Sequence, residues 1–481
     1  MPPHVLTDFV KAYDVRGLVP EQLDVDVAWA LGAAFTEVVI SREQGTGCVI
    51  GHDMRASSPE LSRAFGQGVA SRGIDVTHIG LASTDALYFA SGHLGLAGAM
   101  FTASHNPAAY NGIKLCRPGA RPVGQDSGLA EVRDLAQELL DGTGEQRQVE
   151  PGTTTDKDVL ADYAAFLRGL VDLSGGRPLK VVVDAGNGMG GFTVPAVLGT
   201  EAGLPALPLE IVPLYFELDG TFPNHEANPL EPENLRDLQA AVVEHQADIG
   251  LAFDGDADRC FVVDERGEPV SPSAITSLIA TREIAREVAA GTPAEDVAIV
   301  HNVITSAQVP EVIAALGAKA VRTRVGHSFI KGEMARANAV FGGEHSAHYY
   351  FRDFWFADTG MLAAMHTLAA LGEQSEPLSK TMTAYSAYSA SGEINSTVDD
   401  AAAATAQVRA WAQDKDVEVD ELDGLTLTHR GSDGDPMWWL NLRASNTEPL
   451  LRLNVEAADE DTMAAIRDDV LSVVRGTARG N

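Results

Sequence analysis

Residues 249–264 carry the sequence IGLAFDGDADRCFVVD. The two apolar runs in it, Ile249 to Phe253 and Cys260 to Val263, have the length and composition of buried strands. The loop between these runs holds three carboxylates and a guanidinium: Asp254, Asp256, Asp258 and Arg259. Three aspartates between apolar strands would repel one another without a cation. Because Mg²⁺ takes oxygen ligands, the loop predicts a site for a hard divalent cation.

A calcium-binding EF-hand is the competing metal site, since its loop also begins D-x-D-x-D. Glu265 even falls at position 12 of such a loop. Position 6, however, holds Arg259, where the sharp turn of an EF-hand needs glycine. The flanking segments are also typical of strands and not of helices. The sequence therefore favours magnesium over an EF-hand.

Short apolar runs that end in a glycine or a polar loop recur along the chain. They cover residues 48–50, 98–101, 179–183, 249–253, 297–300 and 339–341. Helical patterns such as residues 129–140 and 232–245 lie between them. Strands that alternate with helices predict mixed or parallel sheets covered by helices, an α/β fold. In such folds the loops after the carboxyl ends of the strands build the site.

The last part of the chain has a different pattern. Residues 401–412 predict a helix, residues 425–429, 437–442 and 450–455 predict strands, and residues 459–474 predict a closing helix. This order indicates a small α+β domain. A chain of 481 residues also exceeds one hydrophobic core. We expect four domains, over residues 1–153, 154–268, 269–389 and 390–481.

Composition excludes several classes of partner. The formal net charge of −33 argues against nucleic acid, which needs a basic face, and against an anionic membrane surface. No apolar stretch is long enough to span a membrane, and residues 1–10 lack the pattern of a signal peptide. The three cysteines form no C-x-x-C pair, which suits a reducing compartment. We therefore expect a cytoplasmic protein without nucleic-acid or membrane partners.

A second polar segment, residues 102–107, has the sequence TASHNP and places the hydroxyl of Ser104 in a turn closed by proline. Such a serine is also common in plain turns and helix caps. Downstream, Asn111 and Gly112 predict a tight turn that returns Lys114 toward the same loop. A lysine beside another cation loses basicity and can act as an acid or base. A serine beside a divalent cation is the minimum for phosphoryl transfer through the enzyme itself.

Three further loops have polar or glycine-rich patterns. Residues 186–191, GNGMGG, match G-x-G-x-x-G after a strand, but no acidic residue ends a strand at the right distance, so a glycine turn is favoured over a dinucleotide site. Residues 343–348, GEHSAH, offer groups that suit sugar hydroxyls, or else a capped helix start. Residues 443–449, RASNTEP, suit a phosphate, or else a polar loop between strands.

Five segments together resemble the α-D-phosphohexomutase superfamily, and within it the bacterial phosphomannomutase/phosphoglucomutase group. They are residues 11–17 (KAYDVRG), the Ser104 loop, the aspartate loop, residues 343–348 and residues 443–449. They follow the family's order over the whole chain. The resemblance implies a heart-shaped protein with three similar mixed-sheet α/β domains and a C-terminal α+β domain around a central cleft.

The resemblance also implies roles for individual residues. Ser104 would be the phosphoserine, and Asp254, Asp256 and Asp258 would bind Mg²⁺ with a phosphoserine oxygen. Lys114 would be the acid or base, helped by Arg16 and His327, while Arg259 would orient the phosphoserine loop or the substrate. The implied substrate-binding residues are Tyr13, Arg324, Glu344, Ser346, His348, Arg443, Ser445, Asn446, Thr447 and Arg452.

The sequence departs from the family pattern at three positions. Several relatives have glycine where this chain has Ala347 and methionine where it has His345. Some carry a lysine near the position aligned with Ile304. The positive charge at that point would then have to come from Arg324 or Lys331.

The implied reaction interconverts hexose 1-phosphate and hexose 6-phosphate, with mannose, glucose or both as the sugar. It would run through a phosphoserine and a hexose 1,6-bisphosphate, which also serves as activator. The protein would be a monomer or a weak homodimer with a phosphosugar as its substrate. A phosphoglucosamine mutase, a metal-dependent sugar-phosphate phosphatase and a phosphosugar-binding regulator stay open as alternatives.

Overall fold

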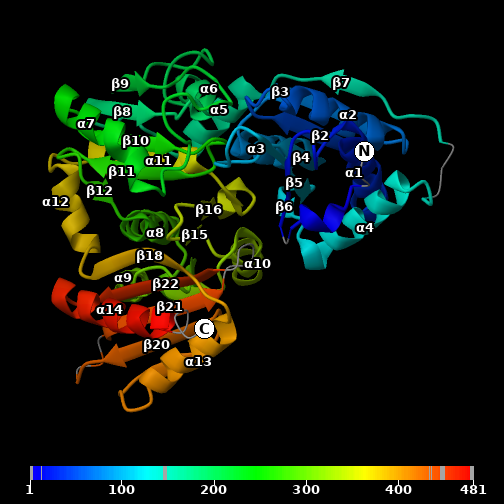
Figure 1. The fold of residues 1–481 in the computed structure, drawn as a ribbon. Coiled ribbons are helices and arrows are strands. Elements are labelled where there is room, and N and C mark those ends of the chain that lie inside the picture. The colour runs from blue at the N-terminus through cyan, green and yellow to red at the C-terminus, as the bar shows by residue number, and fades with distance from the viewer. Residues whose placement is uncertain are drawn as a thin grey trace. The chain divides into compact units, whose positions relative to one another are not determined.

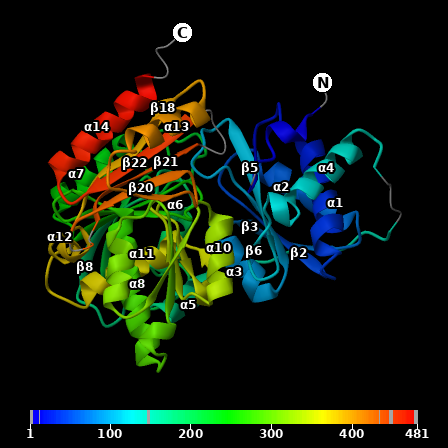
Figure 2. The same ribbon diagram turned by 90° about the horizontal axis from the view of Figure 1, so that it is seen from below.

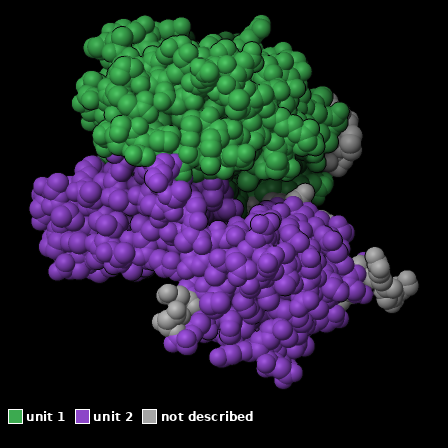
Figure 3. Space-filling model, turned by 90° about the vertical axis from the view of Figure 1, so that its left-hand side faces the viewer, with its two compact units in different colours: residues 1–270, 346–379 green, residues 271–345, 380–481 purple. Residues whose placement is uncertain are grey.

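The computed structural model describes residues 4–11, 13–144, 149–432, 434, 436–444 and 450–476. The chain forms two compact units, which Figure 3 colours separately. The first unit contains Met1–Val270 and Ser346–Ser379, and the second contains Ser271–His345 and Lys380–Asn481. Within the described residues, no helix is both long enough and apolar enough to cross a membrane.

The first sheet of the first unit has the strand order β1-β5-β4-β2-β3-β7, with β6 paired to β5. Its strands are β1 (Val15–Leu18), β2 (Gly47–His52), β3 (Asp75–Leu81), β4 (Ala97–Phe101), β5 (Tyr110–Arg117), β6 (Arg121–Pro122) and β7 (Thr154–Asp156). The pairs among β4, β2, β3 and β7 are parallel, whereas β1, β5 and β6 pair antiparallel. The predicted mixed sheet is therefore confirmed.

Helices cover both faces of this sheet. Those near it are α1 (Val25–Phe35), α2 (Ser58–Ala70), α3 (Thr84–Leu94) and α4 (Leu129–Leu140). The helices α1, α2 and α4 lie on one face, and α3 lies on the other (Figures 1 and 2). Glycines let α1 and α2 approach closely: a Cβ on Gly32 would lie 2.2 Å from the carbonyl oxygen of Phe65, and one on Gly68 would lie 2.1 Å from that of Trp29.

The second sheet of this unit has the order β12-β11-β10-β8-β9. Its strands are β8 (Leu179–Asp184), β9 (Leu209–Leu214), β10 (Ile249–Phe253), β11 (Cys260–Asp264) and β12 (Pro269–Val270), and its helices are α5 (Leu160–Leu170), α6 (Gly190–Val197) and α7 (Arg236–His245). The strands β10 and β11 pair antiparallel, with Phe253 opposite Cys260. The aspartate loop therefore joins two strands, as predicted, and its flanks are not the helices of an EF-hand.

A later segment of the chain completes the first unit. It contains β16 (Tyr349–Phe351), β17 (Ala357–Asp358) and α11 (Gly360–Gly372). Trp355 stacks on Phe166 of α5 with ring centroids 5.2 Å apart and meets Phe89 of α3 edge-on at 6.2 Å. Gly92 makes room for it, since a Cβ there would lie 2.2 Å from the indole. Through Trp355 the segment therefore packs against α3 of the first sheet and α5 of the second.

The second unit holds β13 (Ala298–Asn302), β14 (Lys319–Thr323) and β15 (Phe341–Gly343), which pair in parallel with β13 in the centre. Helices α8 (Pro272–Ala289), α9 (Gln308–Ala315) and α10 (His327–Ala337) accompany them, and α12 (Leu378–Met382) crosses the division between the units. The carboxyl ends of these strands lead to Asn302, Arg324 and Glu344.

The last sheet is antiparallel, with the order β18-β22-β21-β20-β19. Its strands are β18 (Ser389–Thr397), β19 (Glu418–Asp420), β20 (Leu425–Arg430), β21 (Pro436–Ala444) and β22 (Leu450–Ala457), and its helices are α13 (Ala401–Trp411) and α14 (Glu460–Gly476). Along β21, Leu440 and Leu442 enter the core under the helices. Because side chains alternate along a strand, Asn441 and Arg443 lie on the opposite face. The predicted α+β domain is confirmed.

The predicted domain boundaries stay predictions, and the structure places strands beside three of them. β7 follows residue 153 but pairs with β3, so it belongs to the first sheet. β12 follows residue 268 but pairs with β11 in the second sheet. The third boundary, at residue 389, falls at the start of β18 and not in a linker.

Candidate active site

Three loops or strands of the first unit meet around Ser104. The serine loop follows β4, the aspartate loop follows β10, and Lys114 lies on β5 between them. The two loops touch at Gly255, where a Cβ would lie 2.4 Å from the carbonyl oxygen of Ser104. Glycine is required at this point because any side chain would push the loops apart.

The hydroxyl of Ser104 lies against the aspartate loop. Its Oγ donates a hydrogen bond of 2.8 Å to Oδ2 of Asp254, and it lies 3.2 Å from Nδ1 of His105. The backbone of Ser104 has a φ of 50°, in the left-handed region that a non-glycine residue adopts only when its surroundings enforce it. The serine is buried, so its position is set by the loop rather than by solvent.

The three aspartates are buried, and their oxygens gather in one place. Asp256 accepts hydrogen bonds at Oδ2 from Thr84 (2.6 Å) and Lys114 (2.7 Å), and Asp258 accepts one from Lys114 (2.6 Å). Among the described residues, the Oδ1 atoms of Asp256 and Asp258 have no hydrogen-bond partner. One oxygen from each aspartate lies within 4.8 Å of the others. Buried carboxylate oxygens at this spacing, with two of them lacking a hydrogen-bond donor, fit a divalent cation.

The charges in this cluster shift one another's pKa values. Burial raises the pKa of Asp254 to about 7, although the charge of Arg259 opposes this shift. Burial acts in the same direction on Asp256, but there the Lys114 ammonium outweighs it and holds the pKa far below its usual range. The pKa values of the two aspartates therefore shift in opposite directions: burial and the other aspartates dominate at Asp254, and Lys114 dominates at Asp256.

Lys114 corrects two of the sequence-based expectations. Asn111 and Gly112 form no tight turn, because they lie inside β5, where they pair with Gly17 and Arg16 of β1. The lysine reaches the site because alternate side chains of a strand share a face. The loss of basicity expected from a neighbouring cation is also wrong: burial lowers the pKa of Lys114, but Asp256 and Asp258 outweigh burial and raise it above the usual value.

Two predicted arginines hold the serine loop from different sides. Arg259 donates from Nε to Oδ2 of Asp254 (2.9 Å), and its Nη2 lies 2.7 Å from Nδ1 of His105. Arg16 on β1 pairs with Asp14 (2.8 Å) and donates to Oδ1 of Asn106 (2.5 Å). Both guanidinium groups therefore reach the residues beside the nucleophile.

His105 lies in the serine loop, but its role could not be predicted from the sequence. Burial lowers its pKa far below the usual value, and the charges of Arg259 and Arg16 add to that effect. Its imidazole is therefore neutral, and Nδ1 accepts a hydrogen bond from Arg259. The sequence signal was its place directly after Ser104, but its partner lies 154 residues away.

Arg55 is a second residue whose role could not be predicted from the sequence. It follows β2, is 2 % exposed and lies beneath the serine loop. Its guanidinium donates to the backbone carbonyl oxygens of residues 104, 106, 107 and 110. In the sequence, its position after a predicted strand was the only indication that Arg55 lies near a site.

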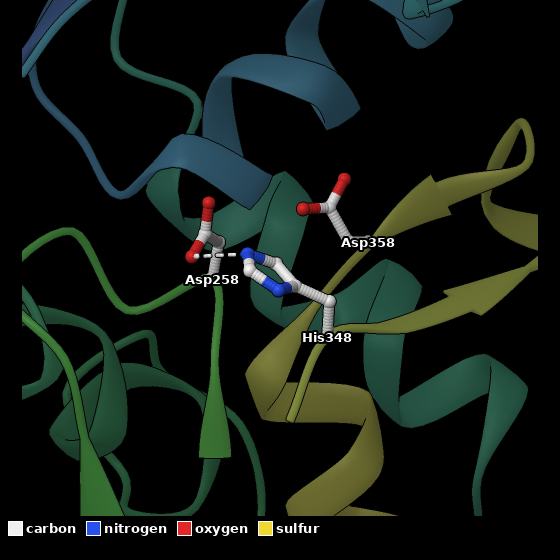
Figure 4. Close-up of side chains that lie close together, drawn as sticks. All are labelled: Asp258, His348 and Asp358. Carbon is white, nitrogen blue, oxygen red and sulfur yellow. Dashed lines mark ion pairs between the residues drawn. The ribbon is translucent and has the colours of Figure 1, made fainter. Parts of the chain in front are cut away.

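His348 approaches the aspartate loop from the segment before β16. Its Nε2 lies 3.7 Å from Oδ1 of Asp258, and the imidazole points toward that carboxylate in Figure 4. Asp358 on β17 lies close enough for the three side chains to hold one metal ion. The hydroxyl of Ser346 lies 3.1 Å from Nδ1 of His348. Tyr13, the remaining predicted residue of this unit, is partly exposed just before β1.

In the second unit, three predicted residues gather at the carboxyl ends of β14 and β15. Oε1 of Glu344 accepts hydrogen bonds from Nδ2 of Asn302 (2.9 Å) and from the backbone N–H of Gly326 (3.3 Å). That glycine directly precedes His327, the first residue of α10. The guanidinium of Arg324 lies over the ring of Phe329, 4.5 Å from its centroid.

Arg443 and Arg452 face each other across the β21–β22 pair. Each lies 3.1 Å from an oxygen of Glu393, so two guanidinium groups share one carboxylate. Two neighbouring guanidinium groups of this kind suit an anionic ligand. The predicted residues Ser445, Asn446 and Thr447 lie outside the described residues.

Four family models match the chain in order. They describe phosphoglucomutase/phosphomannomutase alpha/beta/alpha domain I (residues 8–139), domain II (161–267) and domain III (272–388), and the C-terminal domain (393–473). The chain belongs to the phosphoglucomutase/phosphomannomutase family. The resemblance stated from the sequence and the four-domain α/β architecture are thereby confirmed.

Individual relatives cover almost the whole chain. A phosphomannomutase of Escherichia coli is 38% identical over 473 residues, which is 97% of this chain and 98% of the relative. A protein named phosphohexose mutases, from Xanthomonas campestris, is 40% identical over 469 residues, 97% of this chain and 99% of the relative. The crystal structure of a phosphoglucomutase/phosphomannomutase family protein from Burkholderia thailandensis matches with a TM-score of 0.84 and 31% identity, covering 98% of each chain.

Membership of the phosphoglucomutase/phosphomannomutase family makes this chain an enzyme, an intramolecular phosphotransferase of the isomerase class that serves carbohydrate metabolism. In that family, an acidic cluster such as Asp254, Asp256 and Asp258 is consistent with metal binding. Of the departures noted in the sequence, Ala347 lies in the first unit, and His345 and Ile304 lie in the second. There His345 lies 3.0 Å from the hydroxyl of Ser273, and both Ile304 and Lys331 are buried.

Proposed function

We propose that this enzyme interconverts hexose 1-phosphate and hexose 6-phosphate through a phosphoserine at Ser104, with mannose, glucose or both as the sugar. One observation carries the proposal: the Ser104 hydroxyl donates a hydrogen bond to Asp254 inside a buried cluster of three aspartates. A plain turn serine has no need of such a neighbourhood, whereas a serine that carries a phosphoryl group does.

The proposed reaction has two transfers. In the first, the free hydroxyl of the bound sugar monophosphate attacks the phosphorus of phospho-Ser104, the P–Oγ bond breaks, and a hexose 1,6-bisphosphate forms. The sugar hydroxyl loses its proton, and the leaving oxygen Oγ gains one, so that Ser104 ends the step as a neutral hydroxyl. In the second, Oγ of Ser104 attacks the phosphorus of the other phosphate, the bond from that phosphorus to the sugar oxygen breaks, the proton of the serine hydroxyl passes to the sugar oxygen, and the isomeric monophosphate is released.

The residues around Ser104 support this chemistry in different ways. Asp254, Asp256 and Asp258 would hold Mg²⁺ with an oxygen of Ser104 or its phosphate, and the bound ion would neutralise charge on the transferring group. Arg259 holds Asp254 and His105 in place and offers a guanidinium beside Oγ. Lys114 is the proposed acid or base, with Arg16 and His327 as the proposed helpers.

The sugar and its second phosphate would be held by the residues that the resemblance implied. Glu344, Ser346 and His348 offer a carboxylate, a hydroxyl and an imidazole, which suit sugar hydroxyls. Arg443 and Arg452 supply a local positive charge on a chain with a net charge of −33. We propose that they bind the phosphate that is not being transferred, together with Arg324.

The identity of the sugar rests on the relatives. One relative is a phosphomannomutase, which supports mannose, and another is named phosphohexose mutases, which supports a broader set of hexoses that includes glucose. Hexose 1,6-bisphosphate is the proposed activator, because it can phosphorylate Ser104 at the start of the cycle. A cytoplasmic location, without a nucleic-acid or membrane partner, is part of the same proposal.

The purified enzyme tests this proposal directly. Glucose 1-phosphate and mannose 1-phosphate are incubated separately with Mg²⁺ and a trace of hexose 1,6-bisphosphate, and the products are followed by ³¹P NMR. Conversion to the 6-phosphates without inorganic phosphate supports the mutase, and the ratio of rates gives the sugar preference. Release of inorganic phosphate would indicate the phosphatase instead. If the enzyme converts glucosamine phosphates and neither of these two sugars, the proposed substrate is wrong and the enzyme is a phosphoglucosamine mutase.

Removal of the cation gives a second test. After exhaustive treatment with EDTA, activity is expected to fall to background, because the buried aspartates would then have no cation to share. Addition of Mg²⁺ in excess over the chelator is expected to restore the rate. Full activity in the chelated enzyme would remove Asp254, Asp256 and Asp258 from the metal role.

A further inference from the structure

The Ser104 loop needs an anchor that its own sequence does not supply. The φ of 50° at Ser104 is strained for a residue with a Cβ. Within the loop, the backbone N–H of Ser104 bonds to the hydroxyl of Thr102 (2.9 Å), and that of Asn106 bonds to the carbonyl of Ala103 (3.0 Å). These short-range bonds leave several carbonyl groups of the loop directed into the protein interior.

Arg55 binds those carbonyl groups. Nη2 donates to the oxygens of Ser104 (2.9 Å) and Asn106 (2.6 Å), and Nη1 donates to those of Pro107 (2.9 Å) and Tyr110 (3.0 Å). Nε donates to Oδ2 of Asp53 (3.2 Å). All N–H groups of the guanidinium are thus engaged, and four of the five bonds end on the backbone between residues 104 and 110.

Arg55 is itself held in one place. Asp53 accepts a hydrogen bond from the Arg55 backbone N–H (3.0 Å) and another from the hydroxyl of Ser58 (2.6 Å). The ring of Phe222 lies over the guanidinium, with its centroid 5.2 Å from the central carbon. Because Arg55 is 2 % exposed, water does not compete for its donors.

We infer that Arg55 is a positioning residue for the phosphoryl carrier: its guanidinium fixes the backbone of the Ser104 loop in the strained conformation that aims Oγ at the aspartate cluster. The inference rests on the proposed role of Ser104. Arg55 acts through the backbone, since its hydrogen bonds end on carbonyl groups and not on the serine hydroxyl. Its contribution is to the geometry of transfer, where a displacement of about 1 Å can cost about 100-fold in rate.

Lysine cannot replace arginine in this role. A guanidinium presents five donors in a fixed planar fork, whereas an ammonium presents three donors at one point. Arg55→Lys keeps the charge beside Asp53 but cannot reach four carbonyl groups spread over residues 104–110. The variant therefore separates loss of positioning from loss of charge.

The chain offers a matched control in Arg168 on α5. Its guanidinium also donates to three backbone carbonyl groups, those of Val197, Gly199 and Pro205. These residues lie at the end of α6 and between α6 and β9, beside the second sheet. Arg168→Lys removes a comparable set of hydrogen bonds away from Ser104. It is expected to lower stability without changing the chemistry.

The experiment measures phosphoryl transfer per phosphorylated enzyme. Wild type, Arg55→Lys and Arg168→Lys are charged with glucose 1,6-bisphosphate, and the phosphorylated fraction is determined by intact mass. The charged enzymes are then mixed with glucose 1-phosphate or mannose 1-phosphate in a rapid-quench instrument. Normalising to phosphoenzyme removes any unfolded fraction. The expected result is a single-turnover rate about 100-fold lower in Arg55→Lys and unchanged in Arg168→Lys, with substrate KM unchanged in both.

Chemical rescue gives a second readout that a role in fold stability alone would not produce. In Arg55→Ala, millimolar guanidinium ion is expected to raise the transfer rate per phosphoenzyme, whereas methylammonium at equal ionic strength is not. A rate in Arg55→Lys within twofold of wild type would overturn the inference, as would equal slowing in Arg168→Lys. Wild-type enzyme that takes no phosphate on Ser104 would instead overturn the proposed function, and with it the premise of the inference.

Discussion

At the scale of single residues, the site is a set of side chains whose partners are far apart in the sequence. Asp254 meets Ser104 across 150 residues, and Lys114 meets Asp256 across 142. The hydroxyl, the carboxylates and the ammonium only become a site when two sheets place their loops together. The chemistry of the residues could be predicted from the sequence, whereas their mutual contacts could not.

Ser104→Ala is expected to abolish turnover, because no oxygen is left to carry the phosphoryl group. The fold is expected to survive, since the lost hydroxyl bonds only to side chains of the site. Steady-state rate and thermal unfolding, measured on the same preparation, check both parts. Ser41→Ala, at an exposed serine, is the control and should behave as wild type. Retention of most activity in Ser104→Ala would contradict the proposal that Ser104 carries the phosphoryl group.

His225 gives a prediction about pH. Its Nε2 lies 3.0 Å from Oδ2 of the buried Asp184. Burial alone would lower its pKa, but the hydrogen bond and charge of Asp184 outweigh burial and raise it. A raised pKa in the folded state means that this contact stabilises the protein below the unfolded value of about 6.5 and that the contribution is lost as pH rises through the folded pKa.

His225→Gln is therefore expected to destabilise the protein more at pH 5.5 than at pH 8.5. Urea unfolding at the two pH values measures the difference in free energy of unfolding. His245→Gln, at an exposed histidine on α7, serves as the control. An equal loss at both pH values would show that the charged imidazole contributes nothing.

Some site residues could be predicted from the sequence and others could not. Asp254, Asp256 and Asp258 stand together in the sequence, so their shared role could be predicted from a single loop. Arg55 and His105 could not be assigned, because the acceptors of Arg55 begin 49 residues away and the donor to His105 lies 154 residues away. An isolated arginine after a strand has no local pattern that distinguishes a buried anchor from a surface charge.

At the scale of elements, the strands next to the loops decide the geometry. The hairpin of β10 and β11 was predictable because two apolar runs flank a short polar loop. β5 was not, because Asn111 and Gly112 favour a turn locally, while pairing with β1 keeps them in a strand. Tertiary pairing here overrides a two-residue preference.

Gly112→Ala is expected to destabilise the protein by about 3 kcal/mol, because overpacking against rigid backbone is costly. A Cβ at this position would lie 2.3 Å from the carbonyl oxygen of Val15 and 2.7 Å from that of Thr102. Thermal and urea unfolding measure the loss. Gly169→Ala in α5 is the control, since its Cβ would meet nothing within 4 Å and alanine favours the helix by about 0.5–1 kcal/mol. Equal stability of the two variants would contradict the packing of β5.

At the scale of the whole molecule, charge is the dominant property. The chain has 68 acidic and 35 basic residues, and its formal net charge is −33. Self-repulsion of that size opposes the compact state, and salt screens it over about 10 Å at 0.1 M. The acidic composition could be read directly from the sequence, since it depends on no contact.

We expect the melting temperature to rise when KCl is increased from 0.05 M to 1 M. Each kcal/mol of repulsion removed should raise it by about 2–4 °C or less in a chain of this size. Differential scanning calorimetry measures the shift, and NaCl at equal ionic strength should give the same shift if screening is the cause. A melting temperature that falls with salt would show that ion pairs outweigh the net repulsion.

The segment that carries Trp355 has a consequence for synthesis. The first unit takes its last strands and α11 from Ser346–Ser379, after the chain has already entered the second unit at Ser271. On the ribosome, the earlier part must wait, with Phe89 and Phe166 uncovered, until that segment emerges. Domains usually fold as they are made, from the N-terminus onward. Here the first unit cannot be completed until residue 379 has left the exit tunnel. A chaperone that binds the nascent chain would therefore act before that point, by shielding these aromatic rings.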